Sequence, residues 1–392
     1  MILTLCTACA APLPDEPDDA VQCAECATRY CSERCERYDR RRGGHGKICG
    51  AIASGGGAEQ YNADKRYAEA VAVAVEECAE DTEGQTCYIC LEDGSEEGLV
   101  RGCACRGAAG VAHVSCLAKQ AKILCDEADD SDDERYDESW NKWNKCGMCK
   151  QHYHGMAINA LGWACWKSYV GLPEADDKRC AALRALSHCI AVDDRDGASA
   201  ICIHQANIDS VRRFMPDEEG LLLHAQTNLA LAYKSVGRNS EALALQREVY
   251  AQSKELGDED DVFFSTVTDL ALSLMEADLW GEAKTLLREH LTAASDSLGA
   301  DHLETLYARL YYAESLLYDD GDGETTYEQD RADYLESERI AVDVLRRAER
   351  IYGSGHPVTV EAQDILKEAR EDIAANERKT SLRALPKRPR YN

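Results

Sequence analysis

The stretch CRGAAGVAHVSC, residues 105–116, decides how this chain is interpreted. Its first cysteine is followed by seven residues, a histidine, two residues and a second cysteine, and Cys103 lies just upstream. Thiols and an imidazole at this spacing suit a reactive site, a disulfide framework or half of a metal cage. Cysteine usage along the rest of the chain separates these three interpretations.

The cysteines favour a metal. All 20 lie at or before Cys202. The mildly apolar start lacks a basic region, so we expect no signal peptide and an intracellular protein with reduced thiols. Random placement would give about one CxxC pair, whereas two thiolates on one tight turn can share a tetrahedral zinc ion. The chain has four such pairs: Cys6/Cys9, Cys23/Cys26, Cys87/Cys90 and Cys146/Cys149.

From residue 87 onward, eight potential ligands follow one another in the order four Cys, one His and three Cys. Together with the segments TCYICLED (86–93) and WNKWNKCGMC (140–149), this order resembles the RING-CH (RING-variant) zinc finger. The resemblance implies a cross-brace in which two zinc ions are held by alternating ligand pairs. One ion would be bound by Cys87, Cys90, His113 and Cys116, and the other by Cys103, Cys105, Cys146 and Cys149.

RING-type fingers recruit a ubiquitin-conjugating enzyme charged with ubiquitin, and they act by positioning, without a covalent intermediate. The resemblance therefore implies no catalytic residue, and a thiolate held in a closed four-ligand site is not free to attack. The residues expected to contact the conjugating enzyme are Ile89, Leu117, Gly147 and Met148. Gln120 occupies the place where the family usually has an aromatic residue. The alternative is a finger that only folds and binds.

The first fifty residues carry another set of eight ligands, and TRYCSERC (28–35) lies among them. This pattern resembles the MYND zinc finger, although Glu36 lies where the family often has Gln and its usual Trp is missing. A module of this size buries too little core to fold alone, so zinc would supply the folding energy. The interleaved ligation of the family implies one zinc on Cys6, Cys9, Cys31 and Cys35, and another on Cys23, Cys26, His45 and Cys49.

The second half of the chain is rich in alanine and leucine, with apolar residues at helical spacing. NLALAYKSVGRNSEALALQREVY (228–250) aligns with DLALSLMEADLWGEAKTLLREHL (269–291), and Gly257 aligns with Gly299. A period of about 42 residues built from two helices predicts a solenoid. The pattern resembles tetratricopeptide repeats of the kinesin-light-chain type, which implies a concave surface for peptides or partner helices. We expect about four helical pairs, with His302 and His356 as turn residues.

These observations predict a mainly α protein in which two zinc-stabilised cross-brace fingers precede a tetratricopeptide-like solenoid. The expected segments are a MYND-type finger (1–50), a helical linker (51–80), a RING-CH finger (81–155), the repeats (156–377) and a basic tail (378–392). An acidic insertion, 126–139, interrupts the second finger and is expected to be a solvated loop. The repeats contain a further insertion, 318–334. We expect Trp140 and Trp143 to pack on the second zinc site.

The function that follows is that of a RING-CH ubiquitin ligase with four zinc ions, two in each finger. Its partners would be a conjugating enzyme and protein substrates bound by the repeats and the MYND-type finger. The rival is a non-enzymatic adaptor in which all modules only bind proteins. A net charge of −28 disfavours nucleic acid, and no apolar run is long enough for a membrane span. We expect the protein in the cytoplasm, with the nucleus as the alternative because the tail is basic.

Overall fold

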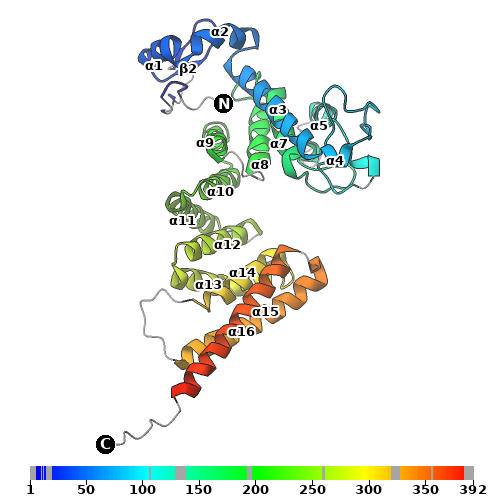
Figure 1. The fold of residues 1–392 in the computed structure, drawn as a ribbon. Coiled ribbons are helices and arrows are strands. Elements are labelled where there is room, and N and C mark those ends of the chain that lie inside the picture. Colours follow the sequence, from blue (N-terminus) through cyan, green and yellow to red (C-terminus); the bar gives the residue numbers. More distant parts are fainter. Residues whose placement is uncertain are drawn as a thin grey trace, which may run out of the picture. The chain divides into compact units, whose positions relative to one another are not determined.

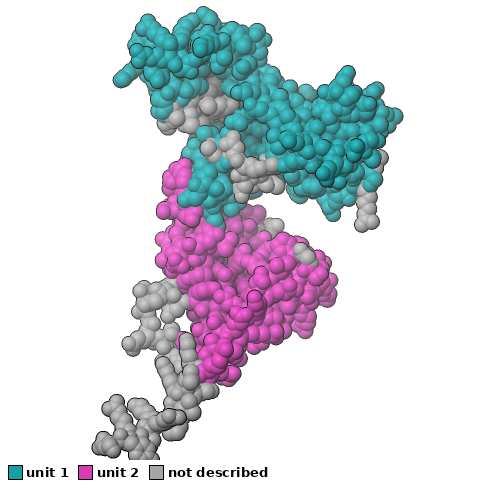
Figure 2. Space-filling model, in the orientation of Figure 1, with its two compact units in different colours: residues 1–237 teal, residues 238–392 magenta. Residues whose placement is uncertain are grey.

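The structure is a computed structural model, and it is mainly helical (Figure 1). Two compact units, residues 1–237 and 238–392, are distinguished in Figure 2. Parts of our predictions lie outside the described residues: 129–137 of the acidic insertion, 319–326 of the repeat insertion and 384–392 of the basic tail. The described residues are 6–9, 11, 13–14, 20–105, 107–128, 138–191, 197–257, 261–318, 327–354 and 356–383.

The first finger, residues 6–54, is built from short elements. Strand β1 (Val21–Gln22) pairs antiparallel with β2 (Arg29–Tyr30), and helix α1 (Glu33–Tyr38) follows. The hydroxyl of Ser32 accepts a hydrogen bond from the Cys35 amide, which satisfies a free donor at the start of α1. A π-helical turn, η2 (Asp39–Gly43), then leads into α2 (His45–Ser54).

The predicted linker is a structural helix. Helix α3 (Ala58–Glu77) packs against α7 (Gly155–Tyr169), which begins just after the second finger, and the short α4 (Ala79–Thr82) follows α3. Alanines are prominent among the buried residues of α3, and their small side chains let two helices approach closely. Helix α7 is buried along most of its length because α3 and α5 (Val114–Glu127) both contact it. The second finger is therefore continuous with a helical support.

Two tryptophans connect the second finger to that support. Trp143 ends the short helix η4 (Asn141–Trp143) and is fully buried. Its ring meets Tyr169 of α7 edge-on at 6.4 Å, and the Trp140 ring lies 5.4 Å from the same tyrosine. We predicted that these tryptophans pack on the second zinc site; the ring contacts found here join them to α7. A further short helix, η3 (Gly107–Gly110), lies within the finger.

Three helices complete the first unit. They are α8 (Asp177–Ala191), α9 (Gly197–Phe214) and α10 (Glu219–Ser235). Helix α8 packs on α7 at Gly162, where an added Cβ would lie 2.6 Å from the Cβ of Cys189. Only glycine fits this crossing.

The second unit is an α-helical solenoid of the predicted tetratricopeptide-like type. Successive helices pack on each other, and alternate helices α12, α14 and α16 also make contact, as stacked helical pairs require. The helices are α11 (Asn239–Leu256), α12 (Asp261–Glu276), α13 (Trp280–Ser297), α14 (Leu303–Ser315), α15 (Tyr327–Tyr352) and α16 (Pro357–Arg383).

The residues at the ends and starts of the repeat helices agree with the sequence pattern. Gly257 and Gly299 have φ values of 77° and 90° and follow the ends of α11 and α13. The left-handed region that they occupy is costly for other residues. His302 and His356 lie at the starts of α14 and α16, where each ring accepts a hydrogen bond from a backbone amide two residues later. Both histidines are turn residues, as predicted. None of the described helices is long and apolar enough to cross a bilayer.

Candidate metal centres

Sixteen cysteine and histidine side chains converge in four clusters. In each cluster the four potential ligand atoms all lie within 4.8 Å of one another. The clusters alternate along the chain within each finger, so both fingers have the connectivity of a cross-brace. The four groups are Cys6, Cys9, Cys31 and Cys35; Cys23, Cys26, His45 and Cys49; Cys87, Cys90, His113 and Cys116; and Cys103, Cys105, Cys146 and Cys149.

The spacing within the clusters fits zinc. A tetrahedral ion with Zn–S bonds of about 2.3 Å separates its sulfur ligands by about 3.8 Å, and separates sulfur from a histidine nitrogen by about 3.6 Å. One distance from each cluster shows the agreement: 3.5 Å for Cys9 Sγ–Cys31 Sγ, 3.6 Å for Cys23 Sγ–Cys49 Sγ, 3.3 Å for Cys90 Sγ–His113 Nδ1, and 3.8 Å for Cys105 Sγ–Cys146 Sγ.

Each CxxC pair lies on a tight turn of the same design. The amide of the first cysteine donates to the carbonyl five residues later, as Cys87 does to Glu92 over 2.9 Å. In three of the turns the residue after the second cysteine has a positive φ: Ala27 at 57°, Leu91 at 65° and Lys150 at 62°. The left-handed residue turns the chain so that backbone amides face the thiols. Because these positions are not glycine, the residue types alone do not reveal the conformation.

Hydrogen bonds determine which nitrogen of His113 can bind a metal. Its Nε2–H donates to the carbonyl oxygen of Asp93 at 2.9 Å, so Nδ1 carries the free lone pair and faces Cys90 and Cys116. Such a second partner is typical of metal-binding histidines. In the first finger the other ring nitrogen faces the thiols, because Nε2 of His45 lies 3.3 Å from Cys23 Sγ and 3.5 Å from Cys26 Sγ.

One thiol in each cluster ionises readily. Burial opposes ionisation of Cys6, Cys23 and Cys87, but nearby backbone amides outweigh it. The pKa of Cys23 falls to about 6, and the pKa values of Cys6 and Cys87 fall to about 7. The amide of Gln151 lowers the pKa of Cys149 to about 7. Each cluster thus offers a thiolate near neutral pH, which is the form that binds zinc.

The four residues expected to contact a conjugating enzyme do not all lie at the surface. The side chains of Ile89 and Met148 are 36% and 47% exposed, and Gly147 is open to solvent. Leu117 is only 7% exposed. Helix α5 begins at Val114, and its register turns Val114, Leu117 and Ala121 inward. The inclusion of Leu117 among exposed contacts is therefore corrected.

Helix α5 also has an exposed apolar residue, Leu124, that was not among the expected contacts. Gln120 faces solvent, and Leu124 lies one turn further along the same side of α5, where it is also exposed. Leu124 follows Leu117 by seven residues, so both lie on nearly the same side of α5 and a helical wheel would not separate them. Their exposed fractions nevertheless differ, at 38% for Leu124 and 7% for Leu117.

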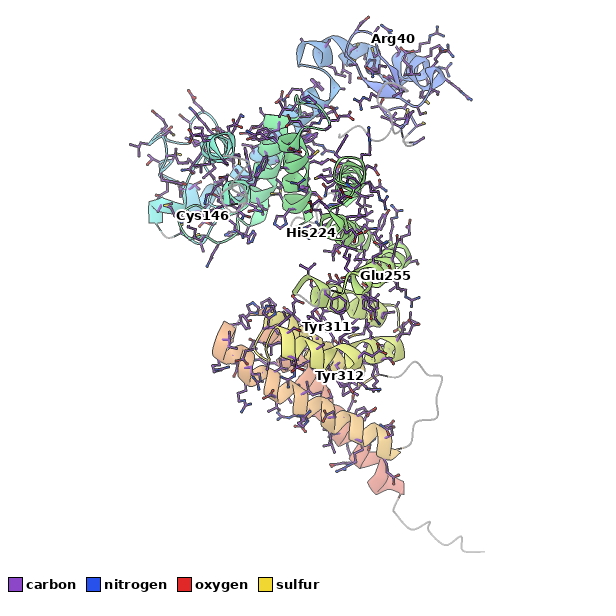
Figure 3. The ribbon with its side chains drawn as sticks, turned by 180° about the vertical axis from the view of Figure 1, so that it is seen from behind. Arg40, Cys146, His224, Glu255, Tyr311 and Tyr312 are labelled. Atoms are coloured by element: carbon purple, nitrogen blue, oxygen red, sulfur yellow. The ribbon has the colours of Figure 1, made fainter. Side chains whose placement is uncertain are left out.

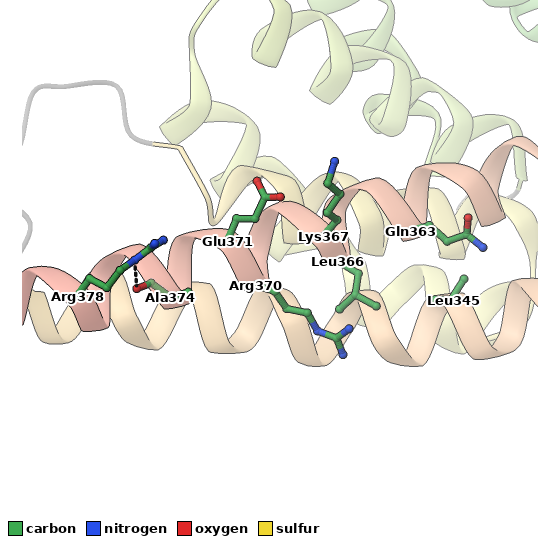
Figure 4. A pocket seen from close by; sticks show the side chains of 8 residues that line it. All are labelled: Leu345, Gln363, Leu366, Lys367, Arg370, Glu371, Ala374 and Arg378. Carbon is green, nitrogen blue, oxygen red and sulfur yellow. Dashed lines mark hydrogen bonds between the residues drawn. The ribbon is translucent and has the colours of Figure 1, made fainter.

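The second unit has an open pocket of about 430 Å³ between α15 and α16 (Figure 4). Leu345 and Leu366 form its apolar floor, and basic side chains border it. One of them, Arg370, pairs with Glu338 at 2.8 Å. The remaining lining residues are Gln363, Lys367, Glu371, Ala374 and Arg378.

Two family models match parts of the chain. Residues 87–149 match the RING-variant domain, and residues 222–256 and 325–358 match a tetratricopeptide repeat. Neither model includes the first finger. The chain therefore contains a RING-variant domain followed by tetratricopeptide repeats, as the sequence analysis predicted. No curated protein is matched by the chain.

Solved structures of kinesin-light-chain-like repeats are similar to the chain at low identity. One structure of a putative kinesin light chain with nearly identical TPR-like repeats from Podospora anserina has 14% identity and a TM-score of 0.38, over 61% of this chain and 96% of that one. BtubC (BKLC) from P. vanneervenii has 14% identity and a TM-score of 0.39, over 60% and 94%. A second structure of the P. anserina protein has 15% identity and a TM-score of 0.35, over 68% and 99%.

Proposed function

We propose that the protein is a RING-CH-type ubiquitin ligase that binds four zinc ions, two in each finger. The observation that carries this proposal is the interleaved pair of clusters within residues 87–149, the segment that matches the RING-variant domain. Each cluster has four ligands and no open position, so zinc has a structural role there. The finger extends from about residue 81 to residue 155, and the repeats follow.

The chain's own contribution to ubiquitin transfer is to hold the conjugating enzyme in position. Ile89 and Met148 extend from the two CxxC turns that open and close the finger, and Gly147 lies beside Met148. Zinc fixes these turns, and the turns present apolar side chains to the conjugating enzyme. A positioned partner lowers the barrier without any catalytic side chain on the ligase.

The first finger and the repeats would select the substrate. We propose a MYND-type finger for residues 1–50, supported by its two interleaved clusters. Protein substrates would also bind the repeats, where the pocket of Figure 4 supplies an apolar floor with a charged border. The cytoplasm is the proposed location, with the nucleus as the alternative.

A non-enzymatic adaptor is the second candidate, and two observations favour it. Gln120 is exposed where an aromatic contact is usual, and Leu117 is buried. Both weaken the apolar surface available to a conjugating enzyme. The adaptor would retain the zinc ions and the protein partners but would form no ubiquitin chains.

A reconstituted reaction separates the two candidates. The zinc-loaded full chain is incubated with ubiquitin, the activating enzyme and a panel of conjugating enzymes. The ligase predicts chains that disappear in Ile89→Ala while zinc content is unchanged, because the substituted residue is exposed. Val360→Ala, which shortens an exposed apolar residue of the second unit, is the matched control and should retain activity. Absence of chains with every conjugating enzyme would favour the adaptor.

Substitution of His113 tests the link between zinc and activity. His113→Ala leaves a cluster with three ligands and should lose both metal and chains. His113→Cys restores a fourth ligand and should recover zinc binding, because Cys₄ sites are closed tetrahedral sites as well. If His113→Ala retains full zinc content and full activity, the proposed ligation is wrong.

A further inference from the structure

The first finger has an exposed cationic face in an acidic protein. The chain carries 44 Lys and Arg against 72 Asp and Glu. Residues 33–48 reverse this balance, with six basic and three acidic residues. We define the cationic face by four basic and two apolar side chains of this segment, all of them exposed: Arg34, Tyr38, Arg41, Arg42, Lys47 and Ile48. Figure 3 labels Arg40, which directly precedes Arg41 and Arg42 in the sequence.

The carboxylates of this region already have partners. Glu33 pairs with Arg37 at 3.1 Å, and Glu25 pairs with Arg40 at 2.8 Å. Glu36 lies 3.5 Å from Arg40, and Asp39 accepts a hydrogen bond from the Tyr30 hydroxyl at 3.0 Å. Within the described part of the chain, ion pairs of this segment involve Arg37 and Arg40 only. The four basic residues of the cationic face therefore form a net positive surface.

The face spans three elements that follow one another along the chain. The turn η2 contacts both helix α1 and helix α2. An added Cβ at Gly46 would lie 3.0 Å from the carbonyl oxygen of Arg40, which shows how closely α2 approaches η2. The zinc clusters of the finger hold these elements in a fixed arrangement, so a ligand would meet a preformed surface.

Two large side chains give the face an apolar component. Tyr38 is 55% exposed at the end of α1, and Ile48 is 45% exposed on α2. Single exposed apolar residues are ordinary on a protein surface. Here they lie among four unpaired cations, a combination that suits a ligand with carboxylates and apolar side chains.

We infer that the cationic face binds an acidic peptide segment of a protein partner, with apolar side chains between its carboxylates. This inference rests on the proposed substrate-selecting role of the first finger. Charge complementarity favours the peptide, because carboxylates meet Arg34, Arg41, Arg42 and Lys47 while apolar residues cover Tyr38 and Ile48. A nucleic acid suits the face less well, since a long polyanion also meets the field of a chain with net charge −28.

Fluorescence anisotropy of the zinc-loaded full chain tests this inference without any ubiquitin component. The probe is a labelled dodecapeptide of Asp and Glu with two Leu and one Phe, and its comparison peptide replaces every Asp and Glu with Asn and Gln. The acidic peptide should bind, and salt should weaken the complex. Arg41→Glu/Arg42→Glu should weaken binding at least about tenfold. Tyr38→Ala should weaken it about threefold. Unchanged zinc content shows that the variants remain folded.

Arg212→Glu/Arg331→Glu is the matched control, because it changes net charge equally with two exposed arginines outside the finger. It should alter binding less than about twofold. Equal binding of the neutral peptide, an equal loss in the control variant, or no binding at all would overturn the inference. Tighter binding of single-stranded oligothymidylate would also overturn it, by assigning the face to nucleic acid. Because no chain formation is measured, this result is independent of the ligase proposal.

Discussion

The first finger and the second unit are held together in different ways. The buried cluster of the first finger has seven side chains, and four of them are cysteines that belong to the candidate metal centres. The cluster around α14, α15 and α16 has fourteen buried side chains and no cysteine. One region is organised by metal ligation and the other by apolar burial. The two regions should therefore respond to different perturbations.

Removal of zinc should distinguish the fingers from the second unit most clearly. A structural zinc site contributes on the order of 10–16 kcal/mol of binding energy, which is folding energy when the apo module is unfolded. A strong chelator should therefore unfold both fingers and leave α11–α16 intact. Hydrogen exchange followed by mass spectrometry would show lost protection in residues 20–54, 87–105 and 107–127, with protection retained in 303–315 and 327–352. Unchanged protection in the fingers would contradict metal-dependent folding.

The reverse perturbation is a cavity in the second unit. Leu310 on α14 is fully buried in its core cluster, so Leu310→Ala should cost about 3–5 kcal/mol of unfolding free energy. Urea denaturation measures this loss, and the zinc content should be unchanged. Leu335→Ala on α15 is the matched control, because that side chain is exposed and should cost well under about 1 kcal/mol. A lower zinc content in Leu310→Ala would show that the fingers depend on this core.

The sets of metal ligands could be predicted from the sequence, but the exposure of individual residues on the second finger could not. Cysteine spacing identifies the CxxC pairs, and the resemblance to known fingers implies how they combine into quartets such as Cys103, Cys105, Cys146 and Cys149, which lie together in the structure. Exposure depends on which other elements cover each turn of α5, because Leu117 and Leu124 lie on nearly the same side of the helix, and the sequence alone does not give that packing. Leu117 was therefore misplaced, and Leu124 was missed.

The packing of segments far apart in the chain could not be predicted from the sequence either. The pattern of residues 58–77 predicts a helix but not its partner, so the segment was described as a linker. The same holds for Trp143, whose burial was expected but whose partner Tyr169 lies on a helix that we assigned to the repeats. The residues at the turns between repeats were easier to predict, because His302 and His356 act within their own turns.

Acidity should affect the two units in opposite directions. Burial lowers the pKa of His204 to about 4, with a smaller effect of His224, so the folded first unit holds a neutral imidazole. Its stability should fall as pH drops from about 6.5 toward 4. Burial raises the pKa of Glu314 to about 7, helped by repulsion from Glu361 and Glu368. The stability of the second unit should fall as pH rises from about 4.5 to 7. Each effect has an upper limit of about 3 kcal/mol.

Single substitutions isolate these groups. Glu314→Gln removes the titrating carboxyl, so the second unit should lose much of its pH dependence between about pH 4.5 and 7. Segment-resolved hydrogen exchange in urea is the measurement. His204→Gln is the corresponding variant in the first unit, where acid also competes with zinc for the thiolates. Unfolding that is equally pH-dependent in Glu314→Gln and in the unsubstituted protein would contradict this assignment.

The smallest expected effects concern two left-handed residues. Ala27 follows a CxxC pair of the first finger at φ 57°, and Gly257 ends α11 at φ 77°. Ala27→Gly relieves about 1–2 kcal/mol of backbone strain and costs about 0.4–1 kcal/mol through the freer unfolded chain, so it should stabilise the finger slightly. Gly257→Ala introduces the strain into open space and should cost about 1 kcal/mol. Chelator competition measures the effect of Ala27→Gly on zinc retention by the finger. Thermal unfolding measures the effect of Gly257→Ala on the stability of the second unit. Weaker zinc retention in Ala27→Gly would mean that the exposed methyl group contributes more than the backbone strain costs.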